Sequence, residues 1–562
     1  MRARTPRLIA TALTLPVALA GGLALASAAV LVLLQQDLTP FQWTAYLGYW
    51  QQLDNPDWQA FAGKIKAAGG VGFGLPLLAW LLLLFKSLQA PERALHGEAK
   101  FANKGDLAAK GLLKDHDQGV VVGQIDGQRI RLAGQQFVIL AAPTRSGKGV
   151  GIVIPNLLDY RDSMVVLDIK QENFDLTSGW RKSIGHEVFL FNPFAEDRRT
   201  HRWNPLSYVS SDPAFRVSDL QSIAAMLYPD GDERNKFWTS QARNAFLALT
   251  LYLFEGLDAD YAHGMARGEW QFPTLGRLYR LANGDGTELK AFLAEKSKAA
   301  FLSANAKNAF ATLLSQAPET FASIMGSFKE PLNAWINPVL DAATSADDFR
   351  LDDVRKKRMT IYVGIQPNKL AESRLIVNLF FSQLINVNTK TLPQNDPKLK
   401  HQCLLLMDEF TSIGKVDIIA TAVSYMAGYN LRLLPIIQSL AQLDAVYGKE
   451  LSRTIITNHA LQIVFTPREQ QDAQDYSEML GTTTDKRKTV TRSSDTTVGE
   501  AVERRALMLP QELKAMPNER EIVFYEGIPN PVMAEKIRYY EDAIYKKRLL
   551  KKTDVPTLRI DH

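Results

Sequence analysis

Residues 137–149 read FVILAAPTRSGKG and join an apolar run to a turn with glycine and positive charge. The run Phe137–Ala141 is short and wholly apolar, which is typical of a buried strand in a parallel sheet. The stretch from Val150 to Leu158 is again apolar and favours a helix. A strand, a tight turn and a helix in this order predict an α/β fold with a phosphate-binding turn.

The turn follows the P-loop pattern G-x-x-x-x-G-K-[ST] with two departures, Ala142 for the first glycine and Gly149 for the hydroxyl residue. In a P-loop, successive N–H groups surround the phosphates and the lysine, here Lys148, reaches the terminal ones. Without the hydroxyl, Mg²⁺ must rely on water and a distant carboxylate. The alternative is an ordinary glycine-containing turn. The predicted nucleotide-binding residues of the loop are Ala142, Pro143, Thr144, Arg145, Ser146, Gly147, Lys148 and Gly149.

An acidic pair supplies the second half of the predicted site. Asp408 and Glu409 follow the apolar residues Leu404–Met407, and ligands bind at the carboxyl ends of strands in open α/β sheets. We expect Asp408 to hold the metal ion and Glu409 to orient or deprotonate the attacking water. The alternative is that both residues only cap the start of a helix.

Two further polar residues end predicted strands. Asp168 follows Met164–Leu167 but has no adjacent glutamate, so we expect it to lie near the phosphates or cap a turn rather than bind the metal. Gln438 follows Leu433–Ile437, and its amide either senses the γ-phosphate through a hydrogen bond or caps a turn.

The rest of the chain predicts a parallel sheet interrupted by helices. Lys148 and Asp408 are 260 residues apart, although roughly 100 would suffice at ~30 residues for each strand-helix-strand unit. The surplus, residues 207–340, has helical periodicity and predicts an inserted all-α domain. Strands are expected at 120–122, 130–132 (after an Asp126–Gly127 turn), 164–167, 188–191, 359–365, 403–407, 431–437 and 461–465, and inserted helices at 219–228, 239–254, 275–282, 289–296 and 304–315.

Two apolar runs near the start predict a two-helix transmembrane hairpin. Residues 8–34 and 67–85 contain no charge, and a bilayer core needs roughly 20 helical residues. Positive residues on both outer flanks predict that both termini lie in the cytoplasm. The alternative for the first run is a cleaved signal peptide. Gly70 and Gly74 form a G-x-x-x-G that could pack helices or could reflect a glycine-rich segment alone.

Composition excludes several classes of protein. Lys and Arg number 65 against 60 Asp and Glu, so nucleic-acid contacts must come from local patches. Cys403 is the single cysteine, which excludes an intramolecular disulfide, and the histidines show no metal-binding spacing. The stretch 482–497 is interpreted as a mobile basic loop that either touches nucleic acid or is merely solvated. The basic segment 536–552, with interleaved tyrosines, is interpreted as a solvated helix, with base stacking as the alternative.

These motifs, taken together, resemble the VirD4/TraG type IV secretion coupling proteins. The matching stretches, in order, are 96–102 (HGEAKFA), 142–151 (APTRSGKGVG), 168–170 (DIK), 237–243 (FWTSQAR), 408–410 (DEF) and 438–440 (QSL). The resemblance runs from the membrane hairpin to about residue 530. A glycine after the P-loop lysine is usual in this branch, so Gly149 does not indicate an inactive site.

The resemblance implies a RecA-like P-loop NTPase domain with the all-α insertion. It implies an ATPase using ATP and Mg²⁺, anchored in the bacterial inner membrane as a homo-hexamer. Its cargo would be a relaxase with single-stranded DNA or protein effectors, passed to the secretion channel. An arginine finger is expected by analogy, at Arg432, Arg453 or Arg468. The expected domains are 1–90 (anchor), 91–206 and 341–530 (nucleotide-binding domain), 207–340 (insertion) and 531–562 (basic tail).

Two alternative functions stay open. In the first, the protein is a docking receptor in which nucleotide sets only the assembly state. In the second, it is a double-stranded DNA pump of the chromosome-segregation type, although the winged-helix tail of that family has no counterpart after residue 530.

Overall fold

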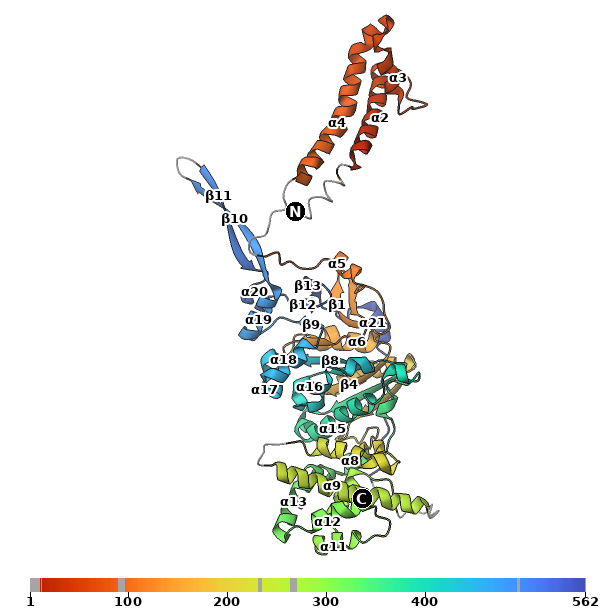
Figure 1. Ribbon diagram of the computed structural model, residues 1–562, viewed down its shortest axis with the longest axis vertical. Helices are drawn as coiled ribbons and strands as arrows, with labels where there is room; N and C mark the ends of the chain where they lie inside the picture. Colours follow the sequence, from red (N-terminus) through yellow and green to blue (C-terminus); the bar gives the residue numbers. More distant parts are fainter. Residues whose placement is uncertain are drawn as a thin grey trace. The chain divides into compact units, whose positions relative to one another are not determined.

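The computed structural model describes residues 11, 13–88, 97–230, 235–262, 270–492 and 496–560, with the backbone alone for 87–88 and 486–502. The chain divides into two compact units, an anchor unit of residues 1–95 and a main unit of residues 96–562 (Figure 1).

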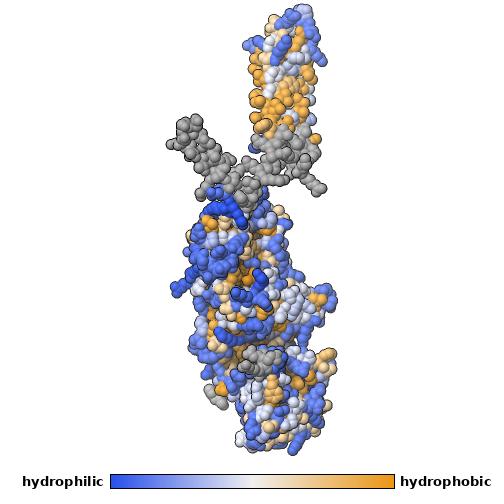
Figure 2. All heavy atoms as spheres, turned by 60° about the vertical axis from the view of Figure 1, so that its left-hand side comes forward, coloured by the Kyte–Doolittle hydropathy of each residue, from blue (hydrophilic) through white to orange (hydrophobic). Residues whose placement is uncertain are grey.

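The anchor unit is a helical hairpin of α2 (Leu15–Leu33) and α4 (Ala62–Leu88), connected through α3 (Ala45–Gln51), η1 (Gln52–Asp54) and η2 (Pro56–Phe61). The segments Leu15–Leu33 and Pro56–Lys86 are long and apolar enough to cross a membrane. Figure 2 shows hydrophobic residues over the visible face of the anchor, the surface chemistry expected for contact with lipid. Most of residues 8–12, in the first predicted span, lie outside the described part.

Glycines bring α2 and α4 together, but they are not the predicted pair. A Cβ at Gly72 would lie 2.4 Å from the backbone nitrogen of Ala26, and a Cβ at Gly22 would lie 2.7 Å from the Phe73 ring. A Cβ at Gly70 or Gly74 would meet no atom within 4 Å. The helix-packing role considered for the Gly70–Gly74 motif is therefore wrong, because these two glycines lie away from the contact.

The main unit is built on a mixed 11-stranded sheet. In the spatial order given at the end of this paragraph, all strands from β9 to β5 run parallel, as predicted. The other four strands, β2, β1, β13 and β12, each pair antiparallel with their neighbours. In spatial order the strands are β2 (Gln128–Leu132), β1 (Val120–Ile125), β13 (Val532–Glu535), β12 (Arg520–Tyr525), β9 (Leu461–Val464), β3 (Val138–Ala141), β8 (Leu431–Ile437), β7 (Cys403–Met407), β4 (Ser163–Ile169), β6 (Met359–Ile365) and β5 (Glu187–Phe191).

Both faces of the sheet are buried. Along β3, Val138 and Leu140 belong to one hydrophobic cluster and Ile139 and Ala141 to another, as the alternation of side chains in a strand requires. The helices around the sheet are α5 (Lys104–Ala109), α6 (Ile154–Asp159), α7 (Glu172–Ser183), α15 (Leu370–Asn388), α16 (Asp417–Ala422), α17 (Leu440–Tyr447), α18 (Lys449–Thr457), α19 (Gln470–Leu480), α20 (Pro510–Lys514) and α21 (Ala543–Arg548).

The segment between β5 and β6 is helical, and its described residues contain no strand between 207 and 340. Many of its buried hydrophobic residues belong to the same cluster as one face of the sheet. The five predicted helices are present, and the two helices after residue 315 are not among the predicted ones. The treatment of 207–340 as a separate domain stays a prediction. The helices are α8 (Pro213–Leu227), α9 (Lys236–Ala262), α10 (Leu275–Asn283), α11 (Leu289–Lys296), α12 (Ala304–Leu314), α13 (Pro318–Leu332) and α14 (Pro338–Ala343).

Two sequence predictions for the last eighty residues are wrong. The expected loop at 482–497 is instead most of an antiparallel hairpin, β10 (Thr482–Arg492) and β11 (Thr496–Ala506). The expected basic tail is folded into the main unit, because β13 pairs with β12 and the ring of Tyr545 in α21 is fully buried. Tyr545 is thus not available for base stacking.

Glu521 on β12 is a fully buried carboxyl group, and neither of its oxygens has a hydrogen-bond partner. It fits because Gly123 opposite has no side chain: a Cβ there would lie 2.0 Å from Oε1. Burial raises the pKa of Glu521 well above its usual value, with Lys536 opposing. The folded protein therefore retains the proton at pH values where the unfolded chain has lost it.

Glu521→Gln is expected to raise the midpoint of thermal unfolding, and the gain should grow between pH 5 and pH 7.5. The folded-state pKa is raised, so the wild type loses stability as pH rises above the unfolded pKa, whereas glutamine does not ionise. A difference of about 2 °C at pH 7.5 is expected, measured by differential scanning fluorimetry. A gain that is equal at both pH values would contradict the assignment.

Candidate nucleotide-binding site

The P-loop lies between β3 and the helical turn that leads into α6. The N–H of Ala142 donates to the carbonyl of Ile437 at 2.9 Å, which holds the start of the loop against β8. Arg145 and Gly147 have positive φ values of 60° and 89°, so the chain reverses sharply before Lys148. A glycine at 147 accommodates this conformation without strain. Residues Gly149–Val153 form a π-helical turn, η3, that continues into α6.

The sheet order brings the predicted residues to one edge. Strands β3, β8, β7 and β4 are neighbours and parallel, so their carboxyl ends lie at the same edge. Lys148, Gln438 and Asp408 follow such ends, and Asp168 lies within the last two residues of β4. The Lys148 ammonium lies 3.7 Å from Asp408 Oδ1 and donates a hydrogen bond to Glu409 Oε1. Two parts of the chain separated by 260 residues therefore meet through one lysine.

Glu409 is the centre of a polar network. Its second oxygen, Oε2, accepts from the amide of Gln438 at 2.8 Å, and the Thr144 hydroxyl donates to Gln438 Oε1 at 3.1 Å. Burial opposes ionisation of Glu409, but the hydrogen bonds from Lys148 and Gln438 outweigh it and hold its pKa below the usual value. Glu409 is therefore a carboxylate at neutral pH, and Gln438 connects it to the P-loop.

Asp408 has the features of a metal ligand. Burial raises its pKa above the usual value, and Lys148 offsets part of this rise. Its Oδ1 is buried without a hydrogen-bond partner. The part of the chain that the structure describes contains no cluster of three His, Cys, Asp or Glu that could hold an ion. A Mg²⁺ ion suits such a site, because it binds through one or two carboxylates together with water and substrate phosphates.

Asp168 has the capping role that the sequence left open. Its fully buried carboxyl group accepts from the backbone N–H groups of Asn173 at 3.2 Å and Phe174 at 2.8 Å, at the start of α7. Burial, only partly offset by these hydrogen bonds, raises the pKa of Asp168 to about 7.

The structure excludes one candidate for the arginine finger. Arg432 on β8 is fully buried, and its guanidinium donates to the carbonyls of Gln136, Gln118 and Leu132 at 2.7, 2.8 and 2.9 Å. It cannot reach a neighbouring subunit, so the prediction is wrong for this residue. Arg453 and Arg468 are exposed.

The sequence did not predict two contacts in this region. Thr144 is one of the predicted nucleotide-binding residues, but its bond to Gln438 depends on how β3 and β8 pair. Lys536 donates to the Ser146 carbonyl at 3.2 Å, although it lies 390 residues further along the chain. The run Val532–Glu535 before it, with alternating buried residues, is the signal of a strand that could have indicated a folded position.

A P-loop beside an acidic strand end, in a sheet buried on both faces, defines a RecA-like α/β nucleoside-triphosphatase fold. The chain belongs to the family described as Type IV secretory system Conjugative DNA transfer, which matches residues 97–560. This match confirms the resemblance to VirD4/TraG proteins stated from the sequence motifs.

Individual relatives agree with this assignment. VirD4 of Agrobacterium fabrum is 30% identical over 488 residues, which cover 84% of this chain and 69% of the relative. TraG of Escherichia coli is 27% identical over 519 residues, covering 81% of this chain and 78% of the relative.

The fold is also found in solved structures of the conjugative coupling protein TrwB. The unbound form of TrwBdeltaN70 has a TM-score of 0.56 at 18% identity and covers 84% of this chain and 98% of that one. Other TrwB structures contain the ATP analogue ADPNP (TM-score 0.56, 17% identity, 84% and 99% covered) or ADP with Mg²⁺ (0.55, 17%, 80% and 96%).

Proposed function

We propose that the protein hydrolyses ATP with Mg²⁺ and couples hydrolysis to the transfer of substrates into a type IV secretion channel. The observation that supports this most directly is the contact of Lys148 with both Asp408 and Glu409. That relatives of the same fold are solved with ADPNP and with ADP and Mg²⁺ agrees with it. The purified full chain should release phosphate from ATP only when Mg²⁺ is present, and no turnover under either condition would contradict the proposal.

Each side chain has a distinct role in the proposed reaction. Loop residues Ala142–Gly149, including Lys148, bind the phosphates. Asp408 holds the metal ion, which neutralises charge on the transferred phosphoryl group. A triphosphate arriving at the loop competes with Glu409 for the Lys148 ammonium. Glu409 is then released to orient the attacking water, and Gln438, between Glu409 and Thr144, is placed to respond to the phosphate.

The proposal includes an inner-membrane anchor with both termini in the cytoplasm. Arg2, Arg4 and Arg7 precede the first apolar segment, and Lys86 and Lys100 follow the second, as expected when positive flanks stay inside. Cysteines introduced one at a time at Asp54 and Lys100 test it, since the native Cys403 is buried. A membrane-impermeant thiol reagent should label only the first from outside.

The cargo would bind the helical segment between β5 and β6. Phe215, Tyr261 and Ile336 are 62%, 72% and 65% exposed there, so their side chains are accessible to a partner. A photo-crosslinking amino acid at each position of the full-length protein should capture a relaxase, if the cargo is DNA, or secreted effector proteins. Crosslinks to neither class would contradict a substrate-receiving role for this segment.

We further propose that six copies assemble into a ring, as the family resemblance implies. Arg453 and Arg468 are the two remaining candidates for an arginine that completes a neighbour's site, because both are exposed. Analytical ultracentrifugation with ATP analogue tests the ring size.

A further inference from the structure

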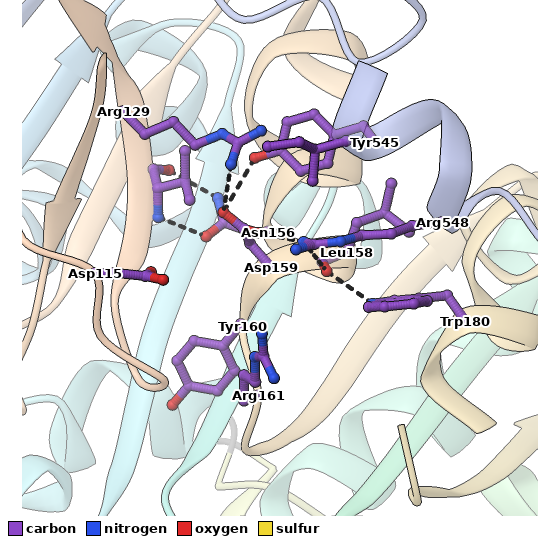
Figure 3. Close-up of polar contacts among 12 residues, drawn as sticks. Asp115, Arg129, Asn156, Leu158, Asp159, Tyr160, Arg161, Trp180, Tyr545 and Arg548 are labelled. Carbon is purple, nitrogen blue, oxygen red and sulfur yellow. Dashed lines mark hydrogen bonds and ion pairs between the residues drawn. The ribbon is translucent and has the colours of Figure 1, made fainter. Parts of the chain in front are cut away.

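The C-terminal strap, defined as residues 536–558, contacts the P-loop helix at both of its ends. At the far end, Asp159 closes α6 and accepts hydrogen bonds from Tyr545 and Arg548 of the strap and from Arg131 of β2. Figure 3 shows Tyr545 and Arg548 directed toward Asp159, with Arg129 stacked on the Tyr545 ring at 4.3 Å. The strap therefore contacts the C-terminal end of α6, the helix that follows the phosphate-binding loop.

At the near end, the strap contacts the loop itself. The Lys536 ammonium donates to the carbonyl of Ser146 at 3.2 Å and lies 3.7 Å from the centre of the Phe465 ring. One residue further, the carbonyl of Ile537 lies close to Gly151, where a Cβ would approach it to 3.5 Å. The same segment thus packs along the chain from Ser146 to Asp159.

The environment of Lys536 is costly for a lysine. The residue is only 9% exposed, and burial lowers its pKa to about 8, although Glu521 and Glu519 oppose this. Neither oxygen of Glu521 forms a hydrogen bond with Lys536, and the raised pKa of Glu521 favours its uncharged form. The ammonium contacts the Ser146 carbonyl and an aromatic face instead. A buried charge is retained at such a cost only where surrounding contacts stabilise it.

We propose that Lys536 is a positioning residue of the nucleotide site, which fixes the P-loop through the Ser146 carbonyl and adds positive charge that favours a bound triphosphate. Its side chain reaches the loop from the antiparallel part of the sheet, so the end of the chain helps to shape a site formed mainly by parallel strands. This inference rests on the proposed ATP hydrolysis and identifies a second lysine that supports it.

Lys536→Met is expected to raise KM for ATP about tenfold, the size of losing one hydrogen bond to a charged group, with kcat within twofold of wild type. Steady-state hydrolysis by the full-length protein measures both constants. Lys552→Met is the matched control, since Lys552 belongs to the same strap but pairs with Asp175 at 2.9 Å on the surface. That control should keep both constants.

Loss of folding alone would give a different result. A purely structural role predicts a lower unfolding temperature and a lower kcat at unchanged KM, and that result overturns the proposal. If Lys536→Met does not fold, Lys536→Gln decides, because it keeps an N–H donor and removes the charge. A rise in KM of at least about threefold is then expected, and an unchanged KM overturns the proposal.

Lys148→Ala, measured alongside, tests hydrolysis itself, so turnover that survives in that variant contradicts the proposed function independently of Lys536.

Discussion

Lys148→Ala is expected to reduce ATP turnover about 10²–10³-fold, the range found when a group that stabilises transition-state charge is removed. Lys148 is the only side chain of the described structure with an ammonium within 4.0 Å of both Asp408 and Glu409. Without it, the terminal phosphates lose their cation and the two carboxylates repel the incoming nucleotide. Phosphate release by the purified full-length protein measures the effect, and substrate transfer in cells should fall with it.

Lys110→Ala is the control for this experiment, because Lys110 is exposed at the end of α5 and has no contact with the site. Both variants should remain in the membrane fraction. Normal substrate transfer by the Lys148→Ala variant would contradict the motor role.

Glu409→Gln is expected to lower kcat by about 10²–10⁴, the usual contribution of a general base, while ATP still binds. The substitution keeps the size of the side chain and its ability to accept from Gln438, but it removes the negative charge that orients or deprotonates water. Loss of the ion pair with Lys148 also frees that lysine for the phosphates, so the affinity for ATP should not decrease. Equilibrium binding of a fluorescent ATP analogue and single-turnover hydrolysis measure the two quantities.

This variant separates a motor from a docking receptor. A motor retains nucleotide and stops transferring substrate, whereas a receptor that needs nucleotide only for assembly continues to transfer. Glu196→Gln, the same substitution at an exposed residue after β5, is the control. Transfer at the wild-type rate by Glu409→Gln would favour the receptor.

The parts of the fold that could be predicted are those with local signals. Strands β6, β7 and β8 have the predicted bounds, because each is mainly apolar and is followed at once by a polar residue. Lys148, Asp408 and Gln438 come together because parallel strands place their carboxyl ends at one edge. For these residues, a short motif and a general rule of sheet topology were sufficient.

The parts that could not be predicted depend on long-range pairing. β12 pairs antiparallel with β9 and β13 pairs antiparallel with β12, and nothing in their sequences specifies these partners. The positive charges of 536–552 favoured a solvated helix, yet Tyr545 is buried and Arg548 is half-buried, and both bind Asp159, almost four hundred residues earlier in the chain. The sequence shows an arginine at position 432 but not the three backbone carbonyls that bind its guanidinium. It therefore could not exclude Arg432 as an arginine finger.

The most direct test of the central claim is a structure of the full-length Glu409→Gln variant with ATP and Mg²⁺. The triphosphate is expected within the loop Ala142–Gly149, with its terminal phosphate at Lys148 and the metal ion beside Asp408. A loop that stays empty at saturating ATP, or nucleotide bound away from the Asp408 strand end, would contradict the claim that this site binds and splits the nucleotide.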